Sequence, residues 1–476
     1  MKVLFTASEV NPFAKVGGLA DVVGSLPKAL KRERVDARII MPKYGIIDQK
    51  LLDNAVFLGN TYVQMGWRNQ YAGLFSTVYN GVTVYFVDNQ YYFGGDKVYG
   101  YIEGEAEKFA FFCLAVLELL PLMDFTPEII HCNDWQTGLI PVLLKTRYAH
   151  LGIKTVFTIH NLKFQGIYGI EMMKDLLSFD DSFFTQQTLE FYGGASYMKG
   201  GLLFADRITT VSRTYAKETQ TEFFGERLDG VLRSRSDVYC GILNGLDYKE
   251  YNPATDKLIP FKYSADDISG KEKCRYALEE ELGLPHSHSP IIAMVGRLYD
   301  QKGLALIERM LPELLLSDDF RLVVLGSGDH GYETMFQNAQ GRYNDRVRAI
   351  IGFDNALAHR IYAGADLFLM PSLFEPCGLS QLIAMRYGTL PIVRETGGLA
   401  DTVKPYNKYD GSGVGFSFEN FNAHDMAYTI RYALSCMKDD EVRAGLIRNA
   451  MTADFSWTSS AKEYKQLYKQ VLGKKR

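Results

Sequence analysis

Short apolar runs alternate with segments of helical periodicity along most of the chain. Residues 2–7 form the first apolar run; a loop, a helix over residues 19–30 and a second run at 37–41 follow. A strand, a helix and another strand in this order predict a βαβ unit and hence a parallel sheet. Further strands are predicted at residues 129–132, 154–159, 208–211, 238–243, 291–295, 321–325, 367–370 and 390–393.

A polar stretch at residues 254–288 divides this pattern into two halves. A chain of 476 residues is too long for one hydrophobic core, and its length predicts roughly two or three domains. We expect one domain over residues 1–245 and a second over 246–455. Residues 456–476 are expected to form a terminal helix, because they carry an apolar stripe opposite a lysine-rich face.

Two successive turns from a strand to a helix lie within residues 366–403. The first turn contains a single carboxylate, Glu375, and the second contains Thr396 with two glycines after it. Backbone N–H groups at helix N-termini attract anions. The segment therefore predicts a site for a phosphate-bearing ligand beside a charged group. The sequence GGLAD occurs in the second turn and also at Gly17–Asp21, which suggests two related domains facing one ligand; the alternative is two independent tight turns.

The motifs EPCGL (375–379), RYGTLP (386–391), TGGLADTV (396–403) and KVGGLAD (15–21) resemble those of the glycogen and bacterial starch synthases. The resemblance extends from the first residue to the last helix. It implies an α/β fold of the GT-B glycosyltransferase type, with two Rossmann-like domains facing a central cleft and a C-terminal helix that crosses back to the first domain. The implied reaction moves glucose from ADP-glucose to the non-reducing end of an α-1,4-glucan, with retention of configuration.

The sequence offers fixed cations rather than a metal for the leaving diphosphate. It contains no Asp-x-Asp motif, whereas Arg297, Lys302 and Lys15 each lie next to a glycine turn. Arginine supplies a bidentate fork and lysine a point charge. A solvated surface charge is the usual alternative for one basic residue, but three such residues favour a phosphate site. We therefore expect no metal and no cofactor.

By resemblance, individual residues receive expected roles. Glu375 and the Cys377–Gly378 backbone would hold the glucose hydroxyls, and Phe353 would stack on the nucleobase. Where the wider superfamily has a second glutamate, this chain has Ile383, as the glycogen synthase branch allows. The expected catalytic residues are Glu375, His160, Asp134, Lys302 and Arg297. The expected substrate-binding residues are Lys15, Gly17, Gly18, Asp21, Asn244, Phe353, Cys377, Gly378, Ser380 and Thr396.

Residues 62–101 are rich in Tyr and Phe, which stack on sugars but also favour strands. Sheet packing is the preferred interpretation for most of them. By the resemblance, Tyr91, Tyr92 and Trp135 are the expected acceptor contacts.

Three other functions fit parts of the sequence. A transferase of the same fold could use UDP-glucose or a small acceptor. The glycines of residues 326–331, with Asp354 about twenty residues on, match a dinucleotide fingerprint, although that fingerprint normally lies in the first βαβ unit. We interpret this stretch as a tight turn. A catalytically silent glucan-binding protein would need only the aromatic residues.

Composition removes several classes of function. The formal net charge of −4 argues against a nucleic-acid binder. The longest apolar run, residues 109–123, contains Glu118 and is too short to span a bilayer. Six scattered cysteines are typical of reduced, mostly buried thiols, and the beginning of the chain does not resemble a secretory signal. These features favour the cytoplasm, with ADP-glucose and a glucan as the binding partners.

Overall fold

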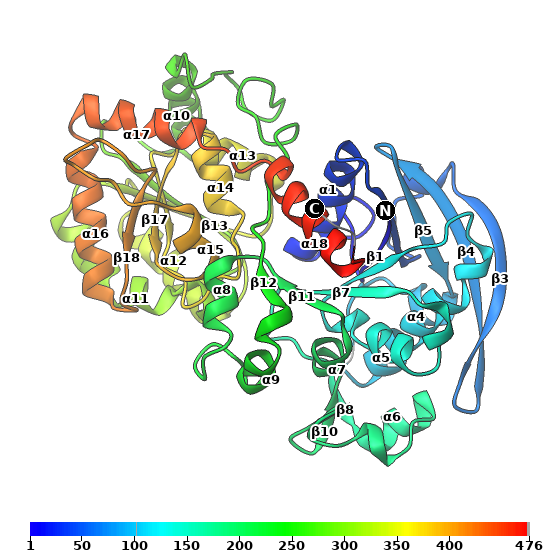
Figure 1. Ribbon diagram of the computed structural model, residues 1–476. Helices are drawn as coiled ribbons and strands as arrows, with labels where there is room; N and C mark the ends of the chain where they lie inside the picture. Colours follow the sequence, from blue (N-terminus) through cyan, green and yellow to red (C-terminus); the bar gives the residue numbers. More distant parts are fainter. Residues whose placement is uncertain (101, 474–476) are drawn as a thin grey trace. The chain divides into compact units, whose positions relative to one another are not determined.

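The computed structural model describes residues 1–100 and 102–473 and divides into two compact units (Figure 1). The first unit comprises Met1–Gly245 and Trp457–Arg476, and the second comprises Leu246–Ser456. Tyr101, the end of the predicted aromatic stretch, lies outside the described residues. The predicted α/β class with parallel sheets is confirmed, because each unit is built around a sheet whose core strands run parallel.

In the described part of the first unit, the main sheet has the strand order β12-β11-β7-β6-β1-β2-β5-β4-β3. The strands are β1 (Lys2–Thr6), β2 (Asp36–Pro42), β3 (Val56–Met65), β4 (Arg68–Tyr79), β5 (Val82–Asp88), β6 (Ile129–Asn133), β7 (Lys154–Ile159), β11 (Arg207–Thr210) and β12 (Tyr239–Gly241). All neighbours are parallel except for β3, β4 and β5, where β4 runs antiparallel to both of the others. This antiparallel edge contains much of the aromatic stretch: Tyr85 and Phe86 are buried, as sheet packing requires, whereas Tyr62 and Trp67 are exposed.

Helices cover this sheet, and a small second sheet lies beside it. The helices are α1 (Gly18–Arg32), α2 (Gln49–Leu52), α3 (Gln90–Phe93), α4 (Ile102–Glu118), α5 (Leu139–Lys145), α6 (Ile170–Leu177), α7 (Tyr197–Phe204), α8 (Arg213–Glu218), α9 (Asp229–Ser234) and α18 (Trp457–Val471). The small antiparallel sheet consists of β8 (Ile167–Gly169), β10 (Gly194–Ser196) and β9 (Glu190–Phe191).

The terminal helix α18 belongs to the first unit and packs beside α1 (Figure 1). Its apolar stripe buries Tyr464 and Tyr468 completely. The Tyr468 hydroxyl lies 2.7 Å from Nδ1 of His131, a buried residue of β6. A hydrogen-bonded polar pair inside the core fixes the helix more specifically than apolar contact does. His131 therefore has a structural role.

The second unit is a doubly wound parallel sheet with the order β15-β14-β13-β16-β17-β18 over the described residues. Its strands are β13 (Ile291–Val295), β14 (Arg321–Gly326), β15 (Val347–Ile351), β16 (Leu367–Met370), β17 (Leu390–Arg394) and β18 (Phe416–Phe418). Its helices are α10 (Ser269–Leu282), α11 (Leu304–Ser317), α12 (His330–Arg342), α13 (Asn355–Gly364), α14 (Ser380–Arg386), α15 (Gly397–Thr402), α16 (Ala423–Cys436) and α17 (Asp440–Thr452).

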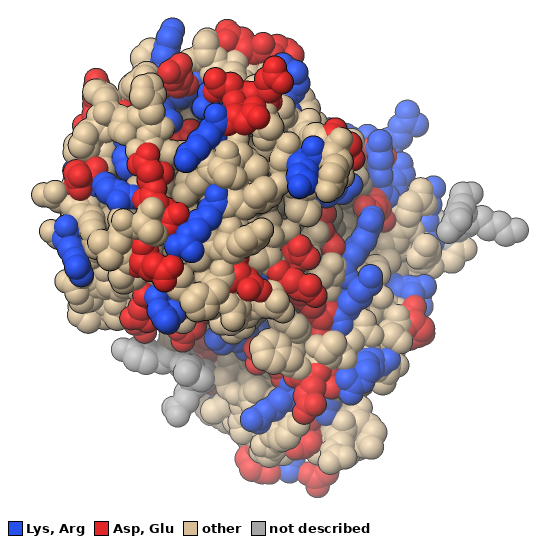
Figure 2. All heavy atoms as spheres, turned by 90° about the vertical axis from the view of Figure 1, so that its left-hand side faces the viewer, with Lys and Arg blue, Asp and Glu red and all other residues tan. Residues whose placement is uncertain are grey.

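Surface composition agrees with the small net charge. Acidic and basic side chains are interspersed on the face shown in Figure 2. All six cysteines are thiols rather than disulfides, and five of them are buried, as predicted. No helix in the described part of the chain is both long and apolar enough to cross a membrane.

Candidate functional site

The order of strands in the second unit reverses between β13 and β16. Later strands are added beyond β14 on one side of β13 and beyond β16 on the other. In open α/β sheets, ligands bind outside the carboxyl ends of the strands at such a switch point. Arg297 and Lys302 follow β13, and Glu375 follows β16. The switch point therefore collects three of the five predicted catalytic residues.

Lys302 and Glu375 form an ion pair at this position. The Lys302 ammonium lies 2.6 Å from Oε2 of Glu375, and the Ser372 hydroxyl donates to the same oxygen at 3.2 Å. The Glu375 side chain is only 9% exposed, whereas that of Lys302 is 28% exposed. The carboxylate is thus held in a buried position and the cation remains accessible. The contact between these two residues is not evident from the sequence, in which 73 positions separate them.

Gly303 makes this contact possible. Its φ is +71°, and a Cβ there would lie 1.9 Å from the carbonyl oxygen of Pro371. The backbone that follows β13 therefore packs directly on the backbone that follows β16. The Leu373 amide completes the approach by donating to the carbonyl of Gln301 at 2.9 Å.

The second GGLAD motif holds the Glu375 loop from the other side. A Cβ on Gly397 would lie 1.9 Å from the carbonyl oxygen of Glu375, and the Gly398 amide donates to that oxygen at 3.1 Å. Thr396 is completely buried. The turn thus supports the Glu375 loop, and contact of this turn with phosphate stays a prediction.

The remaining predicted residues of the second unit differ in accessibility. Phe353 is 86% exposed directly before α13, so its ring is free to stack on a ligand, and Arg297 is also exposed. Ser380, the first residue of α14, is partly exposed. Cys377 is buried, and Gly378 has φ +74° with Gln381 packed against it. Backbone contacts to a ligand are therefore more accessible here than the thiol is.

The first unit has its own switch point between β1 and β6. Lys15 follows β1, and its ammonium lies 2.7 Å from Oδ1 of Asp21, which also accepts from Asn11. The amides of Val16 and Gly17 both donate to Oε2 of Glu9, at 2.6 and 2.9 Å. In this structure the Gly17 amide therefore already has a carboxylate acceptor within the chain, and phosphate contact at Gly17 and Gly18 stays a prediction.

Asp134 and His160 meet after the neighbouring strands β6 and β7. Oδ1 of Asp134 accepts from the backbone amides of His160 (2.7 Å) and Asn161 (3.3 Å). Asp134 itself adopts a left-handed φ of +55°. Burial raises the pKa of its carboxyl from 3.8 to about 7, with the negative charge of Glu9 adding to the rise. Asp134 positions the His160 loop in this structure rather than projecting both oxygens toward a ligand.

His160 is poised to accept a hydrogen bond. Nδ2 of Asn133 donates to two backbone carbonyls, which leaves its Oδ1 directed at Nε2 of His160, 2.9 Å away. Nε2 must therefore carry the proton, so Nδ1 is the acceptor. Burial lowers the pKa of His160 to about 3, which keeps the ring neutral at physiological pH. A neutral ring suits contact with a sugar hydroxyl.

Asn244, the predicted binding residue near the boundary of the units, is 93% buried at the end of the first unit. Its Oδ1 has no hydrogen-bond partner among the described residues. A buried amide oxygen without a partner costs free energy unless something else donates to it. The residue thus retains capacity for one further hydrogen bond.

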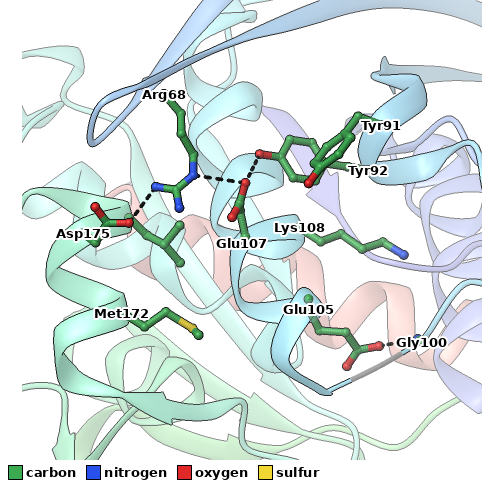
Figure 3. A pocket seen from close by; sticks show the side chains of 11 residues that line it. Arg68, Tyr91, Tyr92, Gly100, Glu105, Glu107, Lys108, Met172 and Asp175 are labelled. Atoms are coloured by element: carbon green, nitrogen blue, oxygen red, sulfur yellow. Dashed lines mark hydrogen bonds and ion pairs between the residues drawn. The ribbon is translucent and has the colours of Figure 1, made fainter.

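Two of the three expected acceptor aromatics belong to the core. Trp135 is 7% exposed and packs against Phe109, Tyr168 and Tyr197, so it offers no free face to a sugar. Tyr92 is buried and donates to Glu107 at 2.6 Å (Figure 3). These two expectations are corrected.

Tyr91, by contrast, is 80% exposed and remains available. It lies at the edge of a hollow of about 660 Å³. Figure 3 shows the same hollow crossed by Arg68, which pairs with Glu107 and Asp175.

Glu9 and Tyr99 are functional candidates that the sequence analysis missed. Glu9 is 4% exposed, and its Oε1 accepts from the Tyr99 hydroxyl at 3.1 Å. A carboxylate three residues after β1 and eight before Gly17 was the available signal. Glu9 can hold the Val16 and Gly17 amides only because the loop after β1 folds back over it, and the sequence pattern does not reveal that fold.

The glycines of residues 326–331 form a tight turn, as interpreted from the sequence. The Gly328 amide donates to the carboxylate of Glu333 at 2.8 Å, and a Cβ on Gly326 would lie 1.9 Å from the carbonyl oxygen of Gly296. Asp354 caps α13 by accepting from the Leu357 amide. The turn and the acidic residue thus serve the fold, which removes the basis for a dinucleotide site. The described residues include no cluster of three or more His, Cys, Asp or Glu placed to hold a metal ion.

Comparisons with known proteins agree with this arrangement. The starch synthase catalytic domain matches residues 2–234, and the family of glycosyl transferases group 1 matches residues 280–452. A glycogen synthase of Lachnospira eligens is 51% identical and covers 98% of this chain and 99% of that protein. The glycogen synthase of Geobacillus stearothermophilus is also 51% identical, over 100% of this chain and 98% of the relative.

Among solved structures, the catalytic domain of starch synthase IV from Arabidopsis thaliana, bound to ADP and acarbose, superposes with a TM-score of 0.91. It is 34% identical and covers 99% of both chains. A sucrose-phosphate synthase from Thermosynechococcus elongatus, at 19% identity and a TM-score of 0.63, shares the fold.

Proposed function

The chain belongs to the glycogen synthase family, GT-B enzymes that transfer glucose to a growing glucan, and we propose that its donor is ADP-glucose. The observation that carries the proposal is the Lys302–Glu375 pair at the switch point of the second unit. A buried carboxylate beside an accessible cation suits a ligand that combines sugar hydroxyls with a diphosphate. The ADP in the starch synthase structure supports the adenine nucleotide.

Each unit supplies a cation for the diphosphate in this proposal. Arg297 and Lys302 would neutralise the leaving phosphate from the second unit, and Lys15 would add a contact from the first. Phe353, exposed before α13, would stack on the adenine. These fixed charges replace a metal, so we propose that the enzyme needs none and that EDTA leaves transfer unchanged.

The glucose would be held by residues of both units. Glu375 and the Cys377–Gly378 backbone accept and donate to its hydroxyls, and neutral Nδ1 of His160 accepts from another. Asp21 orients Lys15, Asp134 orients His160, and the open acceptor on Asn244 takes one further donor. In the reaction, the bond from C1 to the diphosphate breaks as the bond from C1 to the acceptor hydroxyl forms. The hydroxyl proton passes to the departing phosphate on the same face, so configuration is retained and ADP leaves.

The acceptor is proposed to be the non-reducing end of an α-1,4-glucan such as glycogen, within the cytoplasm. Tyr91 remains a candidate acceptor contact because its ring is exposed. No nucleic acid or membrane enters this function.

A transfer assay with both donors tests the proposal. Glycogen is supplied with labelled ADP-glucose or UDP-glucose in parallel, and the linkage of the product is read by digestion with enzymes of known α-1,4 specificity. A higher kcat/KM with ADP-glucose is expected. Equal or reversed preference would assign the chain to a UDP-glucose transferase of the same fold, and binding of glycogen without transfer would identify a silent glucan-binding protein.

A further inference from the structure

Glu9 is a buried carboxylate to which the proposed reaction assigns no task. It follows β1 and is 4% exposed, yet it has no cationic partner within hydrogen-bonding distance among the described residues. Within the described part of the chain, it accepts hydrogen bonds from the amides of Val16 and Gly17 and from the Tyr99 hydroxyl. A buried charge is tolerated only where such donors compensate for lost hydration. These donors therefore stabilise the buried Glu9 carboxylate and, in return, are held in place by it.

The segment that Glu9 holds contains Lys15. The earlier part of this loop has its own support, because Val10 and Ala14 exchange two backbone hydrogen bonds of 2.9 Å. The later part leads into α1, whose N-cap, Gly17, has an extended backbone and no side chain to accept from the helix amides. Glu9 accepts instead from the amides of Val16 and Gly17, the two residues that precede the first helical residue, Gly18. Lys15 therefore lies between Ala14, which is bonded to Val10, and Val16, which is bonded to Glu9.

The negative charge at this helix end comes from the protein itself. A ligand phosphate placed on the Val16 and Gly17 amides would meet the Glu9 carboxylate and be repelled. The Lys15 side chain is 40% exposed and its ammonium is paired with Asp21, so the cation and the amides have different partners. The amides anchor the loop, and the cation is left for the ligand.

We propose that Glu9 is a positioning residue that clamps the Val16–Gly17 backbone and thereby preorganises Lys15 for the donor diphosphate. The second half of this statement rests on the proposed function, in which Lys15 contacts the donor. Preorganisation raises affinity because the loop loses less freedom when the ligand binds. Glu9 acts through the loop and not on the reacting atoms.

The clamp is tested first without any ligand. In Glu9→Ala, exchange of the Val16 and Gly17 amide hydrogens should accelerate about ten- to a hundredfold, the range expected from losing a hydrogen bond to a charged group. The bond between Lys15 and Val16 is also a trypsin site, so the fragment 1–15 should be released faster from the variant. Glu9→Gln keeps one acceptor oxygen, so its rates of amide exchange and of trypsin cleavage should lie between those of Glu9→Ala and the wild type.

A matched control removes a carboxylate that caps a backbone amide elsewhere. Asp180 accepts from the Ser182 amide at 2.9 Å and is exposed, so Asp180→Ala should leave exchange at Val16 and Gly17 unchanged. If Glu9→Ala fails to fold, shown by lost protection in β6 as well, Tyr99→Phe replaces it. That variant removes the hydrogen bond from Tyr99 to the Glu9 carboxylate and should accelerate hydrogen exchange at the Val16 and Gly17 amides by a smaller factor. Unchanged exchange at these amides in a folded variant overturns the clamp.

Titration with ADP then tests the consequence for binding. The Kd for ADP should rise about tenfold in Glu9→Ala, with partial rescue in Glu9→Gln, and KM for ADP-glucose should rise more than kcat falls. Tighter binding would mean that Glu9 competes with the phosphate for the amides, and unchanged binding would mean that the loop needs no clamp; both results contradict the proposal. A wild type that binds no ADP would instead contradict the proposed function, while the exchange result would still stand.

Discussion

At the scale of single residues, the Lys302–Glu375 pair combines two roles that mutation can separate. Glu375 can hold sugar hydroxyls and stabilise positive charge that develops on the ring, but it repels a diphosphate. Glu375→Gln is therefore expected to lower kcat by on the order of 10² or more, the scale of one transition-state group. Binding of ADP should be retained, because Lys302 is freed from its partner. A transfer assay beside an ADP titration measures both.

Lys302→Ala is the contrasting variant. It should weaken ADP binding and slow transfer together, since the phosphate needs the charge in both states. It also leaves the buried Glu375 carboxylate without its cation, which should cost about 1–3 kcal/mol of stability. If Glu375→Gln kept near-normal turnover, or if Lys302→Ala bound ADP normally, the assignment of the switch point as the donor site would be wrong.

Asp134 predicts a pH dependence of stability. Its pKa is raised to about 7 in the folded protein, so between pH 4 and 7 the unfolded chain loses this proton before the folded chain does. The free energy of unfolding should thus fall as the pH rises through this window, by at most about 4 kcal/mol. Asp134→Asn removes the titration, so its stability relative to the wild type should increase from pH 5 to pH 8.

Urea unfolding at several pH values measures this difference. Asp180→Asn provides the control, because the Asp180 side chain is exposed and its pKa is lowered by the Ser182 hydrogen bonds rather than raised by burial. Parallel stability curves for the wild type and Asp134→Asn would contradict a raised pKa for Asp134 in the folded protein.

At the scale of elements, the site depends on how closely two loops approach. Gly303 and Gly411 both have φ +71°, so alanine at either position strains the backbone by roughly 1–2 kcal/mol. Gly411 has no atom within 4 Å of its added Cβ, whereas Gly303 has the Pro371 oxygen at 1.9 Å. Gly303→Ala should therefore separate the β13 and β16 loops and strongly reduce transfer, while Gly411→Ala should reduce stability alone. Equal activities at matched temperature would show that the loop approach is dispensable.

The elements themselves were largely predictable from the sequence. Apolar runs located β7, β13 and β16 at their observed residues, because buried parallel strands are continuous and short. The antiparallel edge of β3 and β4 was not predicted, since its strands are mixed in polarity and β3 is largely exposed. Strand order, and with it the two switch points, follows from tertiary pairing that no local pattern encodes.

The site was predictable in its residues more than in its contacts. Motif spacing placed Glu375, Lys302, His160 and Lys15 near strand ends, where the structure has them. It did not reveal that Glu9 accepts from the Gly17 amide, because that bond joins residues across a folded loop. Trp135 was misassigned because indole rings suit both sugar contact and cores, and only packing against Phe109 distinguishes the two.

At the scale of the whole molecule, the proposal requires that both units act on one diphosphate. Lys15 belongs to the first unit and Lys302 to the second, and each has its own carboxylate partner. Two residues that contact the same ligand group give non-additive effects when both are changed, whereas independent sites give additive ones. The cycle Lys15→Ala, Lys302→Ala and the double variant is therefore expected to show a coupling of about 0.5 kcal/mol or more in ADP binding.

The same cycle with Lys438→Ala in place of Lys302→Ala should be additive, because Lys438 lies in the α16–α17 connection. Additive losses for Lys15 and Lys302 would mean that only one unit holds the diphosphate, and the donor site would then have to be assigned to the switch point of that unit alone.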